Sequence, residues 1–296
     1  MALGKLATRN LLPFLTLGGT AGSVALPRAN LMANALAISP RHLTLPMRQT
    51  DIVTLSQNVL EITFDRPRAI DLVGMLFHTM DLTAKCRLTV AGAGGTLAAP
   101  VYQSAWTKVH PRRTPSLLIP WEEPNFWTGQ AQVADLDVFR RHCLIGLDPK
   151  LVASAIRIEL DNRDNDAGFY DLGNLWISSS FTPAGNFDRG RRLGLKARDK
   201  VQEGPSGRRF AERRQPVREI AFTWSSLTEA EAWQVYDDCA RVGTTGMVIF
   251  VPDVANVAGT AREAFPGTFI EGSLAEPVFT FEKQHTVSVA IREIIA

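Results

Sequence analysis

The sequence predicts a mainly β fold, arranged in two β-rich parts with one amphipathic helix. Apolar stretches are short, and proline or glycine ends most of them, which is typical of strands. Several stretches alternate between apolar and polar residues, as strands with one buried face do. Residues 228–241 instead have the start signal and the apolar spacing of a helix that packs against a sheet.

The first part, residues 49–182, is predicted to be a β-sandwich. Its strands are short and are separated by turn residues, which suits two sheets packed face to face. The strands at 155–160 and 169–177 flank the polar turn 161–168 and are predicted to pair as a β-hairpin. The strands predicted in this part are 60–64, 69–77, 86–90, 155–160 and 169–177.

The last part, residues 217–296, is predicted to form a strand–helix–strand unit that two further strands complete. Thr228 and Glu231 have the spacing of a capping box, and Gly243 is placed to end the helix. The strands predicted here are 217–224, 247–251, 278–281 and 286–291. The residues predicted to lie on the apolar side of the helix are Ala230, Trp233, Val235, Tyr236 and Cys239.

Two segments do not have the pattern of a domain. Residues 1–48 are apolar but are broken by glycine and proline, which predicts an arm that needs other parts of the protein for support. Residues 183–216 contain few apolar residues and many arginines, with Gly204-Pro205-Ser206-Gly207 in the middle. This composition predicts a long, mobile, basic loop or linker.

Composition excludes several classes of function. The hydrophobic fraction is 45% and the charged fraction is 21%, as in soluble globular proteins. A formal net charge of +2 provides no whole-molecule attraction to DNA or to an anionic membrane. No apolar run approaches the roughly 20 residues that span a bilayer, so no membrane insertion is expected. Cys86, Cys143 and Cys239 lie far apart, which predicts buried thiols rather than a disulfide framework or a zinc site.

No arrangement of residues indicates catalysis. The five histidines lack metal-ligand spacing, and neither a nucleophile elbow nor a phosphate-binding loop is present. The glycines of residues 91–95 are interpreted as a loop between strands. Glu122 and Glu123 are adjacent and would point apart, so they do not form the carboxylate pair of a glycan-cleaving enzyme. The sequence therefore predicts a protein that is not an enzyme and that has no cofactor and no metal.

Three clusters are candidates for binding. Asp161, Asp164 and Asp166 lie on a turn, where they either bond their own backbone or bind calcium. The aromatic residues proposed to bind a glycan, or to pack on the sandwich or on a neighbouring subunit, are Trp121, Phe126 and Trp127. The residues proposed to form a subunit interface are Arg189, Arg191, Arg192, Arg208, Arg209, Arg213 and Arg214.

The arginine cluster has alternative interpretations. Arginines pair with acidic groups of a neighbouring subunit or with nucleic-acid phosphates. Phe187 and Phe210 are the only aromatic residues among them, which is too few for a platform that stacks bases. We therefore favour an inter-subunit loop over nucleic-acid binding, and a solvated linker remains a third interpretation.

Two stretches together resemble proteins of tailed bacteriophages. Residues 156–162 with 169–177 resemble the closing hairpin of galactose-binding-like β-sandwiches, and residues 64–72 resemble an early strand of such a module. Residues 218–232 with 248–253 resemble the strand–helix–strand of phage minor tail and distal tail proteins. That family uses a split β-barrel with one flanking helix to form a ring that joins the tail tube to the tail tip.

The resemblance implies a structural role in the virion. Residues 1–48 and 217–296 would form the ring domain, the sandwich of 49–182 would be inserted into it, and 183–216 would be the basic linker. The implied partners are copies of the same chain, in a hexameric ring or a trimer, together with tail-tube and tail-tip hub proteins. In the simplest distal tail layout the accessory domain follows the ring domain, and this sequence departs from that layout. The alternative hypothesis is a carbohydrate-binding adhesin that contacts glycans of the host surface.

Overall fold

The structure is a computed structural model that describes residues 3–11, 24–25, 46–132, 141–203, 207–270, 277–281 and 284–295. Strands make up 47% of it and helices 11%, which confirms the predicted mainly β fold class. The chain divides into two compact units. We call residues 9–180 with 254–262 the sandwich unit, and residues 1–8, 181–253 and 263–295 the helix unit.

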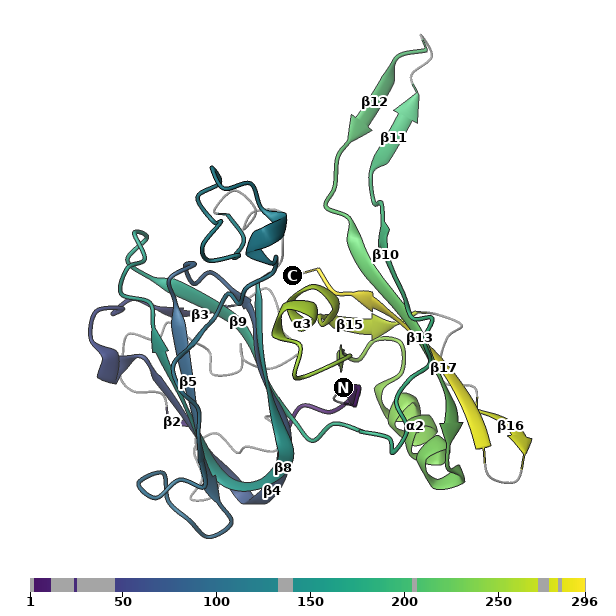
Figure 1. Cartoon of the computed structure of the whole chain (residues 1–296), viewed down its shortest axis with the longest axis horizontal. Helices are drawn as coiled ribbons and strands as arrows, with labels where there is room; N and C mark the ends of the chain where they lie inside the picture. Colours follow the sequence, from purple (N-terminus) through teal and green to yellow (C-terminus); the bar gives the residue numbers. More distant parts are fainter. Residues whose placement is uncertain are drawn as a thin grey trace. The chain divides into compact units, whose positions relative to one another are not determined.

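The sandwich unit is built on one eight-stranded antiparallel sheet (Figure 1). Its strands are β2 (Val24–Ala25), β3 (Met47–Gln49), β4 (Val59–His78), β5 (Lys85–Gly92), β6 (Tyr102–Gln103), β7 (Thr107–Lys108), β8 (His142–Asp161) and β9 (Tyr170–Ser178). The order is β3-β9-β4-β8-β5-β6, with β2 on β4 and β7 on β5. Each stretch expected to be a strand in this part lies in a strand, but 60–64 and 69–77, expected as two strands, are both parts of β4.

Two long strands, β4 and β8, turn this sheet into two layers. Residues 59–63 of β4 pair with β8 in the layer that continues to β5, whereas residues 72–76 pair with both β8 and β9. The register of the β4–β8 pair shifts between Thr63 and Arg68 and again between Ile70 and Leu72. Such irregularities let a strand bend from one layer into the other. The curved sheet encloses a core to which β4, β5, β8 and β9 all contribute.

The predicted hairpin of 155–160 with 169–177 is wrong. β8 has β4 on one side and β5 on the other along residues 153–161, so it has no free edge there for β9. β9 instead pairs with β4 through Leu72–His78 and with β3 on its other side. The turn after Asp161 therefore carries the chain from one layer of the sandwich to the other.

The helix unit is a second curled antiparallel sheet with one long helix packed on it (Figure 1). Its strands are β1 (Lys5–Ala7), β10 (Arg192–Lys196), β11 (Lys200–Glu203), β12 (Arg209–Glu212), β13 (Val217–Leu227), β14 (Val248–Val251), β15 (Pro266–Phe269), β16 (Val278–Phe281) and β17 (Gln284–Glu293). The main order is β1-β14-β15-β17-β13-β10, with β16 on β17, and β11 and β12 form a separate hairpin.

The predicted helix is present as α2 (Glu229–Val242). Its capping box is formed, because the Thr228 hydroxyl accepts from the Glu231 backbone N–H and the Glu231 carboxylate accepts from the Thr228 N–H. Gly243 follows with φ 61°, a conformation that glycine adopts without strain. These observations confirm the capping box and the glycine stop that the sequence predicts.

The strands that flank α2 are not neighbours in the sheet, since β15 and β17 lie between β14 and β13. One prediction about the helix needs correction. The apolar face of α2 is narrower than expected: Ala232, Val235 and Cys239 are buried, but Trp233 and Tyr236 are 46% and 45% exposed. Their rings contact each other edge to face on the outer side of the helix. Helical spacing alone did not distinguish a buried aromatic residue from an exposed one.

The structure assigns the N-terminal residues differently from the predicted arm 1–48. β1 pairs with β14 and belongs to the helix unit, but β2 and β3 pair with β4 and β9 of the sandwich unit. Residues 1–2, 12–23 and 26–45 of the arm lie outside the described residues. The described part of the arm is therefore divided between the two units.

The other boundaries also differ from those expected. Residues 254–262, predicted within the last part, belong to the sandwich unit, and the helix α3 (Val257–Glu263) begins there. Val254 packs on Gly146 of β8 so closely that a Cβ at residue 146 would clash with it. The predicted linker 183–216 contains β10, β11 and β12 and so is not a simple loop. Among the described residues, no helix is long and apolar enough to cross a membrane.

Candidate interaction surfaces

The arginines that the sequence singles out lie on a β-ribbon, which we call the arginine ribbon (residues 189–203 and 207–214). β10 pairs with β13, and the chain then continues into the β11–β12 hairpin. Figure 1 shows this hairpin extending beyond the rest of the helix unit. Every described residue of β10, β11 and β12 is exposed, so neither face of the hairpin is covered by the described residues.

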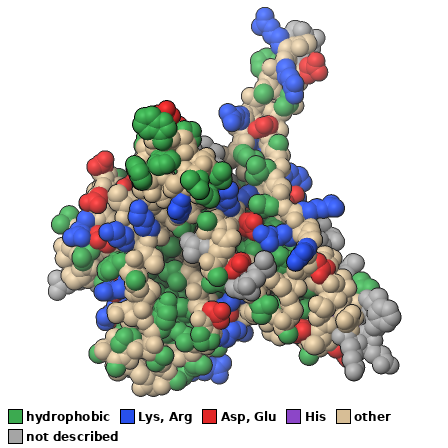
Figure 2. All heavy atoms as spheres, viewed as in Figure 1, with side chains coloured by type: hydrophobic (Ala, Val, Ile, Leu, Met, Phe, Trp, Pro, Cys, Tyr) green, Lys and Arg blue, Asp and Glu red, His purple; other side chains and the backbone are tan. Residues whose placement is uncertain are grey.

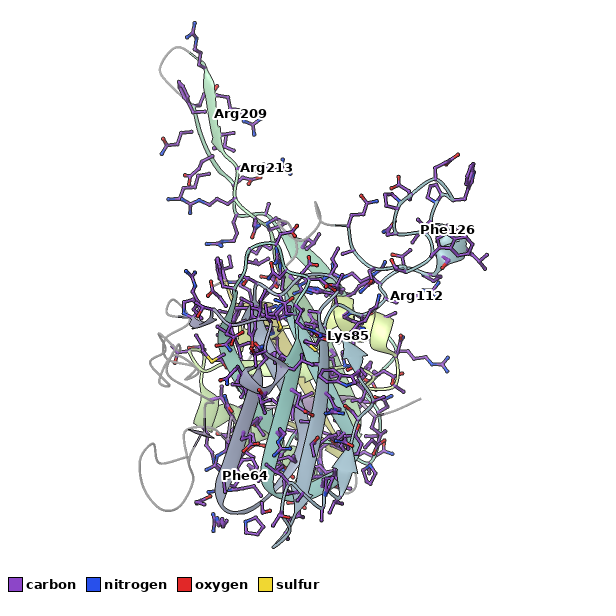
Figure 3. The ribbon with its side chains drawn as sticks, turned by 90° about the vertical axis from the view of Figure 1, so that its left-hand side faces the viewer. Phe64, Lys85, Arg112, Phe126, Arg209 and Arg213 are labelled. Atoms are coloured by element: carbon purple, nitrogen blue, oxygen red, sulfur yellow. The ribbon has the colours of Figure 1, made fainter. Side chains whose placement is uncertain are left out.

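The arginine ribbon carries a large positive charge. Residues 189–214 include ten lysines and arginines and three acidic residues, a net charge of +7 within a chain whose total is +2. Arg191 pairs with Glu263, and Arg214 pairs with Glu212. Among the described residues, no ion pair is formed by the remaining predicted interface arginines, Arg189, Arg192, Arg208, Arg209 and Arg213. Figure 3 labels Arg209 and Arg213, whose side chains extend from the ribbon.

The ribbon also exposes apolar side chains. Leu195 of β10 is 72% exposed, and Phe210 of β12 is 63% exposed. β10 is the outer strand of its sheet, so one of its edges has no strand partner among the described residues. A ribbon that combines cationic and apolar side chains with an open edge can bind a surface that is partly acidic and partly apolar.

An open pocket of ≈ 360 Å³ lies at the base of the ribbon and is lined by Lys196, Arg198, Val217, Arg292, Glu293 and Ile295. Two acidic residues of the sheet neutralise cations near it. Glu219 accepts from Arg292 at 2.6 Å, and Glu293 pairs with Arg218. Arg198 is not part of these pairs, which leaves a cationic side chain on the wall of the pocket.

The aromatic residues that the sequence singles out lie on a second surface, the aromatic loop (residues 112–130). The loop is closed at its base, where the backbone N–H groups of Arg113 and Thr114 donate to the Gly129 carbonyl at 2.8 and 3.0 Å. The buried Gln130 side chain donates to the His110 carbonyl at 2.6 Å and accepts from the Lys108 ammonium at 2.8 Å. These bonds anchor both ends of the loop to the strand region of the sandwich unit.

The tip of the aromatic loop exposes large apolar side chains. Trp121 is 76% and Trp127 is 85% exposed, and Leu117 and Leu118 are more than two-thirds exposed. Phe126 is half-buried, and its ring contacts Trp127 edge to face at 5.0 Å between centroids. Figure 2 shows apolar side chains gathered at this tip, and Figure 3 shows Phe126 on the protruding loop. The alternative that Trp121 and Trp127 pack on the sandwich is therefore wrong.

The acidic turn after β8 is held by its own side chains. Arg163 donates to Asp161 at 2.9 and 3.0 Å, and this pairing lowers the pKa of the Asp161 carboxyl. Asn165 donates to the Phe169 carbonyl and accepts from the Ala167 N–H. These bonds fit the interpretation in which the polar side chains of the turn hold the turn itself. Among the described residues, no group of three or more His, Cys, Asp or Glu side chains could hold a metal ion.

Two groups of reactive side chains were not evident in the sequence. The rings of His78 and His110 lie 5.1 Å apart in the sandwich unit, and burial lowers the pKa of both, that of His78 strongly. The thiols of Cys86 and Cys143 lie 3.9 Å apart. The members of each group come from different strands or loops, so no local motif marks them. Neither a known protein family nor a curated protein matches the sequence.

Proposed function

We propose that this protein is a structural, non-enzymatic component of a bacteriophage tail tip that assembles with copies of itself into a ring. The role follows the resemblance of residues 218–232 and 248–253 to distal tail proteins, and its location is the virion. Its other partners would be the tail-tube and tail-tip hub proteins. The observation that carries the proposal is the arginine ribbon, a surface that is suited to assembly.

A two-stranded hairpin gains little stability by itself in water, and three strands or a packed face are normally required. The β11–β12 hairpin has neither, because its described residues are exposed on both faces. A neighbouring subunit would supply the missing contact. The net charge of the whole chain is +2 and that of the ribbon is +7, so the residues outside the ribbon have a net charge of −5. A second copy of the chain therefore offers acidic groups with which the ribbon can pair.

The outer face of α2 supports the same role. Trp233 and Tyr236 are about half exposed and contact each other there. Aromatic residues are enriched at the centres of protein interfaces, where they bury much area at a small cost in side-chain entropy. The helix unit therefore has two separate surfaces suited to assembly.

The test is the size of the assembly in solution. At tens of micromolar protein, light scattering should detect oligomers, and Arg209→Glu/Arg213→Glu should weaken association at least tenfold because it reverses two unpaired ribbon charges. Arg66→Glu/Lys85→Glu is the matched control, since these exposed residues lie in the sandwich unit and make the same change in net charge. Wild-type protein that stays monomeric, alone and with tail-tip proteins, would contradict the proposal.

A second candidate function is glycan binding by the aromatic loop. The specific observation in its favour is that Trp121 and Trp127 are both exposed on one loop, because flat aromatic faces stack on pyranose rings. A glycan array should detect binding that Trp127→Ala abolishes. Trp233→Ala, which removes an exposed tryptophan from the helix unit, should leave binding unchanged. An array without signal would exclude this function but would leave the assembly role intact.

A further inference from the structure

Cys86 and Cys143 form a pair of thiols in the core of the sandwich unit. Their sulfur atoms are 3.9 Å apart, and the residues are 0% and 6% exposed. Cys86 lies on β5, opposite Leu160 in one layer. Cys143 lies on the part of β8 that pairs with Met75 in the other layer. The two thiols therefore face each other across the core, between layers that share the backbone of β4 and β8 but that no disulfide links.

The two thiols have different proton affinities. The hydrogen bond from Cys143 and a second contact with the Thr107 hydroxyl at 3.4 Å lower the pKa of Cys86, although burial opposes them. That same bond and burial raise the pKa of Cys143 well above its usual value. Of the two thiols, Cys86 is therefore the one that loses its proton more readily. A nucleophilic thiolate beside a second thiol is the arrangement of a cysteine pair that forms a disulfide.

We infer that Cys86 and Cys143 are an oxidation site at which a small peroxide forms a disulfide that links the two layers of the sandwich. In the first step, the Cys86 thiolate attacks one oxygen of hydrogen peroxide, the O–O bond breaks, and hydroxide leaves. Cys86 becomes a sulfenic acid, and the hydroxide takes a proton to form water. In the second step, the Cys143 sulfur attacks the Cys86 sulfur, and the sulfenic hydroxyl leaves with the Cys143 proton as a second water. The two thiols are oxidised and the peroxide is reduced, so the step needs no other reactant.

Disulfide formation requires that the two sulfur atoms approach each other and that peroxide reaches Cys86. A disulfide needs a sulfur–sulfur distance of about 2.05 Å, so the two sulfur atoms, 3.9 Å apart in the reduced pair, must approach each other by roughly 2 Å. Thr107, which contacts Cys86, lies on the two-residue strand β7, and both residues of β7 are exposed. So short an edge strand opens locally at low cost and admits an oxidant of about the size of water.

The disulfide would enclose the chain from residue 87 to residue 142, including the aromatic loop. Because a cross-link of this span restricts the unfolded chain, it should raise the midpoint of thermal unfolding of the sandwich unit by roughly 5–10 °C. Cys239 is an internal control, because it is also buried but is the one cysteine of the helix unit. Its thiol should stay reduced under the same treatment.

The experiment treats the folded, full-length chain with hydrogen peroxide, alkylates the remaining thiols after denaturation, and maps the peptides without reductant. The expected result is a peptide that joins Cys86 to Cys143, together with an alkylated Cys239. The unfolding midpoint should rise on oxidation and return to its original value when a reductant is added. Three results would overturn the inference: both core thiols fully alkylated, sulfinic acid at Cys86 without a cross-link, or a cross-link that forms only in denaturant.

A variant separates the two chemical steps. In Cys143→Ser the second sulfur is missing, so peroxide should leave sulfenic or sulfinic acid on Cys86 in place of the disulfide. Cys239→Ser should keep the cross-link and its rise in the unfolding midpoint. Because the peptide map of the wild-type chain needs no variant, the inference stays testable even if Cys143→Ser does not fold.

Discussion

Asp71 of β4 binds Ser180, the residue at which the chain first leaves the sandwich unit, by two hydrogen bonds. The Ser180 backbone N–H donates to the carboxylate at 2.7 Å and the Ser180 hydroxyl donates at 2.6 Å. Asp71 is completely buried, and the Lys150 ammonium lies 3.6 Å from the same carboxylate. The carboxylate thus fixes the point at which the chain leaves the sandwich unit.

We expect Asp71→Ala to destabilise the sandwich unit by about 3 kcal/mol, because it leaves the buried Ser180 N–H and hydroxyl without their acceptor and removes the carboxylate that faces the Lys150 ammonium. Urea unfolding followed by circular dichroism would measure the loss. Asp166→Ala, on the exposed turn, is the matched control and should change the stability by less than about 0.5 kcal/mol. Equal effects of the two substitutions would mean that Asp71 does not support the core.

The stability of the sandwich unit should decrease in mild acid because of His78. This ring is buried beside His110, His142 and Arg141, and burial and these neighbours hold its pKa well below 6.5. The unfolded chain binds a proton at His78 near its ordinary pKa, whereas the folded chain does not. The stabilisation is therefore complete above about pH 7 and is lost as the pH falls below 6.5. The pKa of His110 is lowered too, which adds to the loss in the same direction.

The measurement is the urea midpoint between about pH 5.5 and pH 8, above the range in which most carboxylates titrate. His78→Leu should reduce the dependence on pH, because it removes the group whose pKa is lowered most and leaves the contribution of His110. A wild-type midpoint that is the same at both ends of this range would contradict the prediction.

The start of α2 should depend on its capping box. Thr228→Ala removes the hydroxyl that accepts the Glu231 N–H, and we expect it to destabilise the helix unit by about 1 kcal/mol. Gln234→Ala, at an exposed position in the middle of the same helix, should cause no loss, because alanine favours helices. Thermal unfolding of the two variants side by side tests the difference.

The β11–β12 hairpin should contribute to assembly and not to the stability of its own subunit. Replacement of residues 200–212 by a short Gly-Ser linker should leave the unfolding midpoint within about 2 °C of the wild type when both are compared as monomers in dilute solution, because all their described residues are exposed. The same variant should lose self-association. A large fall in the midpoint of a monomeric sample would mean that the hairpin packs on its own subunit.

Local patterns in the sequence determined the parts of the fold whose physical cause is local. The helix α2 was predictable because its cap, its length and its glycine stop all lie within sixteen consecutive residues. Strands such as β13 and β17 were predictable because alternation of apolar and polar residues reports a buried face. The exposed strands β10, β11 and β12 have no buried face, and their segment was predicted as a loop or linker. The exposure of Trp233 and Tyr236 was not predictable, since it depends on which face of α2 packs on the sheet, and that face carries Ala232, Val235 and Cys239.

Strand pairing, by contrast, was decided by the tertiary structure. The sequence places β8 next to β9 along the chain, but both edges of β8 are already occupied by β4 and β5 where β9 would pair. Competition between distant segments for hydrogen-bonding edges leaves no trace in the local pattern. The arginine cluster was evident as a composition, but its form as a paired ribbon depends on the partner strand β13.

The sequence by itself determined that this protein is mainly β, that α2 begins at a capping box, and that its arginines and tryptophans are gathered in two short segments. Only the tertiary structure decided which side chains meet. Cys86 and Cys143 are 57 residues apart in the chain, yet their sulfur atoms lie 3.9 Å apart, because the bent strands β4 and β8 fold one layer over the other. The alternation of apolar and polar residues reports which face of a strand is buried. Which residue of another strand that face meets is set by the path of the whole chain.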